Sequence, residues 1–175
     1  MDELRVLTEE ELCPVLAVLT GLPERTPFDA FPDIVARLGW TLQGPRRGVT
    51  NLPVSLRLFS AIDLDNPDGS TDLVKVHFRV TDTLRDAGWF GKKQIEQATP
   101  TMVETISGCL GFPPTRPKRV QPGSTWDLPN GKMVVLDQGD DVIVVQVFSK
   151  RLADVERSEI RWGIDPAHDL DDRPS

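Results

Sequence analysis

The sequence contains no apolar run approaching the ~20 residues that a membrane-spanning helix requires. Residues 1–5 are acidic and precede a polar segment, whereas a secretory signal has a basic start followed by a long apolar stretch. These two absences predict a soluble, cytoplasmic protein with no membrane partner.

Cysteine is scarce. Cys13 and Cys109 lie far apart in the sequence and match no CxxC or His/Cys ligand spacing, so a zinc or redox site has little support. We expect both thiols to be reduced. Cys109 lies on the apolar stripe of a helical segment, which favours packing in the core, and it could act as a nucleophile only beside a base supplied by the fold.

Histidine is equally scarce, with His77 in a strand-like segment and His168 near the C-terminus. No GxSxG, P-loop, GxGxxG, HExxH or kinase signature occurs, so no reaction class is indicated by a motif. The cluster of acidic and turn-forming residues at 63–70 resembles a calcium loop, but its glycine falls one place late and no glutamate occupies the twelfth position. We therefore predict a hairpin turn, no metal, no cofactor and no catalytic residue.

The chain carries 27 acidic against 20 basic residues and a formal net charge of −7, which opposes binding to a phosphate backbone. The most basic segment, residues 116–119, is short and lacks neighbouring aromatic residues for base stacking, so it is interpreted as a linker. Nucleic acid is thus an unfavourable partner, and a protein partner fits the charge better.

Hydrophobic periodicity divides the chain into alternating helical and extended segments. A capping box at Thr8–Glu11 begins the first helix, and Gly39 ends the second. Pro100 is expected to bend or break the third. The predicted helices cover residues ~8–20, 26–39, 92–110 and 152–160, and the predicted strands cover 54–59, 74–80, 124–128, 132–137 and 141–148.

A chain of 175 residues suits one domain, which we place at residues 1–164, followed by an acidic flexible tail at 165–175. The expected fold class is α+β, with a single antiparallel sheet of about five to six strands and helices packed on one face. Segments 132–137 and 141–148 are apolar at consecutive positions, which is typical of central strands. Val134, Val142 and Val144 are therefore expected in the interior.

The alternation in segments 54–59 and 74–80 predicts a partner-binding face. Side chains two apart on a strand point the same way, so Arg57, Lys75, His77 and Arg79 should share the face opposite the helices. This gives a basic patch on an acidic protein, with Phe59 beside it as an apolar anchor. An ordinary solvated sheet face is the alternative.

A second candidate contact is the loop 88–91, where Trp89 and Phe90 stand between two glycines and burial is hardest to achieve. The four tryptophans otherwise fall near element boundaries, where a ring can close a core or anchor a partner.

The element order resembles two known groups. Phe31 and Gly39-Trp40 lead into the sheet. The segment WDLPNG at 126–131 begins the meander formed by the three strands predicted within residues 124–148. This pattern is similar to small actinobacterial immunity-like proteins of unassigned activity encoded near secreted toxins or type VII secretion loci. It also resembles the type III secretion chaperone-like fold.

The first resemblance implies an immunity- or antitoxin-type protein that neutralises a toxin by occlusion, which requires no reactive group. The second implies a chaperone that binds an exported protein through an apolar groove. A third hypothesis is an enzyme whose site is assembled from scattered residues such as His77, Asp82 and Cys109 within a deep pocket.

Overall fold

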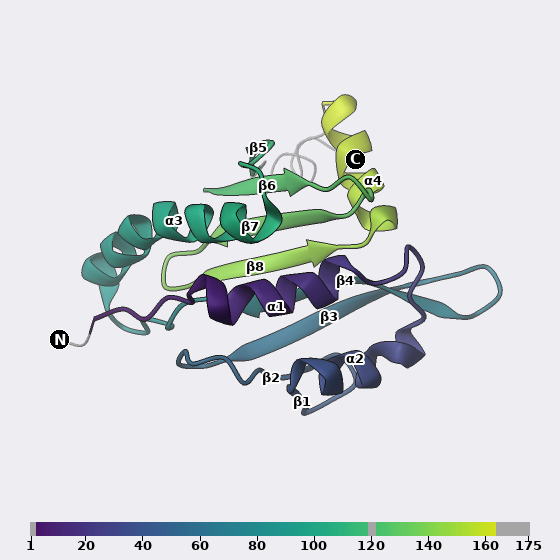
Figure 1. The fold of residues 1–175 in the computed structure, drawn as a ribbon, viewed down its shortest axis with the longest axis horizontal. Coiled ribbons are helices and arrows are strands. Elements are labelled where there is room, and N and C mark those ends of the chain that lie inside the picture. The colour runs from purple at the N-terminus through teal and green to yellow at the C-terminus, as the bar shows by residue number, and fades with distance from the viewer. Residues whose placement is uncertain (1–2, 119–121, 164–175) are drawn as a thin grey trace, which may run out of the picture.

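The first helix begins where the capping box predicts. In the computed structural model, which describes residues 3–118 and 122–163, α1 spans Glu9–Thr20 (Figure 1). The backbone N–H of Thr8 donates to Oε1 of Glu11 at 2.9 Å, which closes the capping box. Leu12, Leu16 and Leu19 are buried on one side of the helix, as their helical spacing predicts.

The second helical segment is divided in two. A 3₁₀ turn, η1, covers Phe28–Ala30, and α2 covers Phe31–Leu38. Gly39 ends α2 in the left-handed conformation at φ +76°. Glycine adopts this conformation without a steric clash because it has no Cβ. The predicted end of the second helix at Gly39 is confirmed.

The sheet is single and antiparallel, as predicted, but it has eight strands instead of five to six. Its order is β1-β2-β3-β4-β8-β7-β6-β5. The additional strands β1, β2 and β5 are two to three residues long, too short to show an alternating pattern. The strand bounds are β1 Thr41–Leu42, β2 Arg47–Val49, β3 Leu58–Asp65, β4 Thr71–Arg79, β5 Arg116–Pro117, β6 Gly123–Asp127, β7 Met133–Gln138 and β8 Ile143–Phe148.

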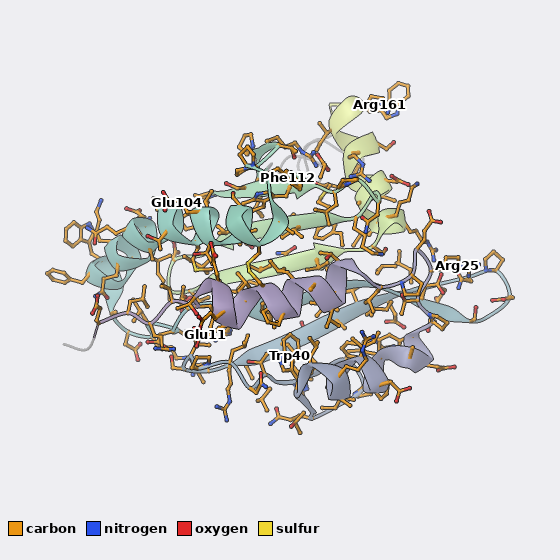
Figure 2. The ribbon with its side chains drawn as sticks, in the orientation of Figure 1. Glu11, Arg25, Trp40, Glu104, Phe112 and Arg161 are labelled. Atoms are coloured by element: carbon orange, nitrogen blue, oxygen red, sulfur yellow. A yellow bond between two sulfur atoms is a disulfide. The ribbon has the colours of Figure 1, made fainter. Side chains whose placement is uncertain are left out.

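The third helix, α3, spans Gly88–Leu110 and continues through Pro100, so the expected break at the proline is absent. In Figure 1, α1 and α3 run beside each other across one face of the sheet. Cys13 of α1 and Cys109 of α3 form a disulfide, seen between these helices in Figure 2. The prediction that both thiols are reduced is therefore wrong, although Cys109 does pack against the core.

The main core lies between the sheet and helices α1, α2 and α3. Trp126 and Phe78 are fully buried there, and the Trp40 ring lies 5.0 Å from that of Phe59 and 5.4 Å from that of Phe78. Val134 and Val142 are buried as predicted. Val144 is only half-buried, because its side chain points to the opposite face, so its assignment to the interior is wrong.

The last helix, α4, spans Lys150–Arg161 and packs on the other side of the sheet. Its buried Ala153 contacts Met133 and Val135, which alternate with the core residues of β7. Helices therefore cover both faces, and the expectation of helices on one face is corrected. No helix within residues 3–118 and 122–163 is long and apolar enough to cross a membrane. The expected tail at 165–175 lies outside the described residues.

Candidate functional site: the open face of the sheet

The sheet face opposite α1, α2 and α3 carries a continuous row of cross-strand neighbours. Directly opposed residues of adjacent strands point to the same side of a sheet, so the register determines the row. Ser60 opposes His77 across β3 and β4, and His77 opposes Gln146 across β4 and β8. We call the part of this side that α4 leaves uncovered the open face. Its central row consists of Arg47, Ser60, His77 and Gln146, and the row continues to Val135 of β7, which α4 covers.

Three successive outward positions of β4 carry basic side chains: Lys75, His77 and Arg79. All three are half-buried, with alternate core residues between them. The Lys75 ammonium lies 5.4 Å from the centre of the Phe148 ring, a favourable cation–π contact. Burial lowers the pKa of Lys75 below its ordinary value, and the negative charge of Asp137 partly offsets this effect. The predicted basic patch is therefore built from β4.

His77 is in contact with Ser60, through Nε2 of the imidazole and Oγ of the serine. Burial is the main cause that lowers the pKa of His77 below 6.5, and the positive charges of Lys75 and Arg79 lower it further. Asp137 acts in the opposite direction. These surroundings therefore favour the neutral imidazole over the imidazolium.

Two acidic groups act on this patch: Asp137 of β7, whose charge acts on Lys75 and His77, and Glu156 of α4, whose charge acts on Lys75. Oδ2 of Asp137 accepts a long hydrogen bond from Nε2 of Gln146 at 3.5 Å, and its Oδ1 lies 3.7 Å from the Lys118 ammonium. Oδ1 is buried and makes no hydrogen bond within the described part of the chain. Asp137 therefore stands near Lys75, His77 and Lys118, and together with Glu156 of α4 it offsets part of the positive charge on this part of the open face.

A pocket of about 320 Å³ is hollowed into the open face between β2 and β8. Arg47 and Arg79 contribute charge to its wall, Ser60 and His77 contribute polar atoms, and Leu58 is 40% exposed. Nη1 of Arg79 is held by Oγ1 of Thr83, to which it donates at 2.7 Å. The remaining lining residues are Gln43, Gly48, Phe59 and Val144.

Two residues of the predicted site lie elsewhere. Phe59 opposes Phe78, not His77, and is 2% exposed, so its side chain packs in the main core and not beside the charges as expected. Arg57 precedes β3, which begins at Leu58, and is exposed in a turn. Lys75, His77 and Arg79 do share one face, as the alternation predicts.

Trp89 is exposed, as expected, but it belongs to the first turn of α3 and not to a loop. Trp89 and Phe90 are 65% and 64% exposed, and their rings lie 5.3 Å apart. The Lys93 ammonium lies 5.6 Å from the Trp89 ring centre. This aromatic pair is on a helix that covers the other side of the sheet, so it is separate from the open face.

Sequence reasoning missed Arg47, Ser60, Gln146 and Asp137. Arg47 lies in a three-residue strand after Gly44-Pro45, where no alternation is visible. Gln146 interrupts the apolar run of β8, and this interruption was the available signal for an uncovered position in a central strand.

The Ser60–His77 contact supplies two members of a nucleophilic site but not the rest. In the described residues, Asp137 contacts Gln146 and Lys118 instead of orienting the imidazole. β3 is paired on both sides, so its backbone amides are used in the sheet and do not form an oxyanion hole. Cys109 is bonded to Cys13 on the helix-covered side, which separates it from His77.

Asp82, the other residue of the scattered-site hypothesis, accepts hydrogen bonds from the backbone amides of Arg5 at 3.0 Å and Ser55 at 2.9 Å. Its carboxylate therefore joins the N-terminal segment to the turn before β3. No cluster of three or more His, Cys, Asp or Glu side chains suited to a metal ion occurs in residues 3–118 and 122–163.

A protein family described as "Family of unknown function (DUF6301)" matches residues 10–149. The matched segment runs from α1 to the residue after β8, so it contains the whole sheet and the pocket. No curated protein and no solved structure matches the chain.

Proposed function

The chain belongs to the DUF6301 family of unknown function, and we propose that it is a non-catalytic protein-binding protein whose open face docks on an acidic surface of another protein. The observation that carries the proposal is the pair of outward cations on β4, Lys75 and Arg79, which flank His77 on a chain with a net charge of −7. A concentrated patch of opposite sign steers encounter with a complementary surface.

The surroundings of this pair support the proposal. Leu58 and Ile62 of β3 are each 40% exposed on the same face and alternate with Ser60. Exposed apolar side chains next to charged ones provide both the desolvated contact and the orientation that protein interfaces need. Lys75 is already half-buried, so a partner's carboxylate would meet a less hydrated cation and form a stronger ion pair.

The cellular role we propose is that of an immunity-type protein that neutralises a toxin by covering it. Occlusion requires a stable scaffold and a complementary surface, and it requires no reactive group. A secretion chaperone would instead present an apolar groove for an extended segment. The open face carries basic side chains at three successive outward positions of β4, Lys75, His77 and Arg79, which favours the first role.

The test begins with the proteins encoded next to the gene of this chain. Each is co-expressed with the wild-type chain and with a Lys75→Glu/Arg79→Glu variant, and co-purification and suppression of growth arrest are measured. We expect one neighbour to be toxic, to co-purify with the wild-type chain and to bind the variant more weakly, with an affinity that falls as salt rises.

The matched control is Arg37→Glu/Arg85→Glu, which changes the net charge by the same amount at two exposed positions away from the open face. This variant should bind and protect as the wild type does. The proposal fails if no neighbour binds, or if the folded Lys75→Glu/Arg79→Glu variant keeps full affinity at low salt. Melting curves of both variants establish that each is folded.

A further inference from the structure

Two consecutive arginines at the start of β2 have different partners. Nε of Arg46 donates to Oδ1 of Asp63 at 2.7 Å, and Nη2 donates to Oδ2 at 3.2 Å, a bidentate pair. Arg47 makes no ion pair within residues 3–118 and 122–163 and lines the pocket of the open face. One arginine is thus used to join two segments, and the next one is available to a ligand.

The chemistry of the pocket is that of an anion site with an apolar wall. Arg47 and Arg79 supply guanidinium groups, and no aspartate or glutamate lines the pocket in the described part of the chain. Leu58 and Val144 supply apolar surface between these groups. A volume of about 320 Å³ is near the lower limit of small-ligand pockets, which suits one side chain better than a cofactor.

We propose that this pocket receives the side-chain carboxylate of a glutamate or aspartate on the partner protein. The inference rests on the proposed function and identifies the anchoring group of that interface. A planar guanidinium matches a carboxylate bidentately, so Arg47 and Arg79 bind its two oxygens. The methylene groups of the entering side chain pack against Leu58 and Val144.

His77 reports on occupancy of the pocket. The groups that surround it are Lys75 and Arg79 on its own strand, Ser60 on β3 and Asp137 on β7. In the free protein, burial and the two cations lower the pKa of its imidazole. A carboxylate in the pocket adds a negative charge nearby, so binding raises the pKa of His77.

The experiment follows the His77 imidazole by NMR in the full-length chain, in which His168 is the other histidine and a His168→Gln variant assigns the signals. The probes are N-acetyl-glutamate N-methylamide, its neutral glutamine analogue, and N-acetyl-alanine, whose carboxylate mimics a chain terminus. We expect saturable shifts and a raised His77 pKa with the glutamate probe, and no saturable shift with the glutamine analogue.

Arg47→Gln and Arg79→Gln should each weaken binding of the glutamate probe by about ten- to a hundredfold, the usual effect of losing a charge-assisted contact. Arg57→Gln is the matched control, because Arg57 is exposed nearby but does not line the pocket. This control should bind as the wild type does.

Three results would overturn the inference: equal shifts with the glutamine analogue, unchanged binding in both folded pocket variants, or clearly tighter binding of the terminal carboxylate. The failures are distinguishable. If the probe does not bind but Lys75→Glu/Arg79→Glu still abolishes partner binding, the pocket assignment is wrong and the proposed function stands. If the probe binds but charge reversal does not affect the partner, the pocket binds a carboxylate and the open face is not the interface with that partner.

Discussion

Ser60 and His77 oppose each other directly across β3 and β4, with Oγ of the serine in contact with Nε2 of the imidazole. This contact lies at the centre of the open face, between Arg47 of β2 on one side and Gln146 of β8 on the other. The imidazole is held in place without an orienting carboxylate in the described residues. Its protonation is therefore a direct measure of the charge around it.

The pKa of His77 is expected to lie below 6.5, because burial and the cations Lys75 and Arg79 disfavour the imidazolium. The unfolded chain therefore binds a proton at higher pH than the folded chain. The stability contributed by neutral His77 is present above pH 6.5 and is lost as the pH falls toward the folded pKa. NMR titration gives the pKa, and urea unfolding at several pH values gives the stability.

Lys75→Met should raise the pKa of His77 toward its ordinary value, since it removes one like charge. Arg57→Met should leave that pKa unchanged, because Arg57 is not among the charges that shift it. A wild-type pKa at or above 6.5, or an equal response to both substitutions, contradicts the electrostatic description of the open face.

The disulfide Cys13–Cys109 should contribute strongly to stability, because it closes a loop between residues 96 positions apart. The chain-entropy estimate for a loop of about 100 residues is roughly 4–5 kcal/mol, an upper value for the loss in a Cys13→Ala/Cys109→Ala variant. Urea unfolding with and without reductant measures it. The oxidised wild type should be more stable than both the reduced wild type and the variant; two free thiols by mass spectrometry in the native protein would refute the bond.

The disulfide could not be predicted from the sequence. Nothing in the spacing of Cys13 and Cys109 indicates that α1 and α3 lie beside each other, and the expectation of reduced thiols followed from the assumed compartment. A pairing across 96 positions depends on tertiary packing. Local periodicity carries no information about which two helices become neighbours.

The long elements could be predicted because each has a strong local signal. The capping box at Thr8 gives the start of α1, and the alternation through β4 gives the common face of Lys75, His77 and Arg79. The short strands could not be predicted, because they carry no such local signal. In β2, three residues show no period, so Arg47 and its side of the pocket were missed.

Phe59 and Val144 were assigned to the wrong faces for a related reason. The strand assigned to residues 54–59 begins only at Leu58, so alternation counted from Val54 had no meaning before β3. In β8, the apolar run obscured the period of two, and only the register with Arg79 shows that Val144 points to the open face.

Val144 and Val145 provide a test of the two faces. Val145 is 0% exposed in the main core, so Val145→Asp buries an unpaired carboxylate at a cost of several kcal/mol and should unfold the domain. Val144 is half-buried on the open face, and Val144→Asp should retain a cooperative melt. Thermal unfolding of both variants, followed by circular dichroism, measures the difference. Equal loss of structure in both variants would contradict the assignment of faces.

Gly48 is required by the close approach of β1 and β3. A Cβ at this position would lie 2.0 Å from the carbonyl oxygen of Thr41 and 2.8 Å from the Phe59 ring. Gly48→Ala should therefore destabilise the protein by about 1–3 kcal/mol through overpacking. Gly44→Ala is the control, because its nearest neighbour is the Arg47 side chain at 3.5 Å, an ordinary contact. Similar unfolding midpoints for the two variants would argue against this packing.

Trp89 and Phe90 should be dispensable for the fold. Both rings are about two-thirds exposed at the start of α3, so Trp89→Ser/Phe90→Ser removes little buried area and should leave the melting temperature within a few degrees of wild type. Trp40→Ser, which removes a 5% exposed core ring, should destabilise by several kcal/mol. The Trp89→Ser/Phe90→Ser variant also tests where the partner binds. If the open face is the interface, this variant should bind the partner as the wild type does, whereas Lys75→Glu/Arg79→Glu should bind it more weakly. A folded Trp89→Ser/Phe90→Ser variant that lost the partner, beside a charge-reversed variant that kept it, would move the interface to this aromatic pair.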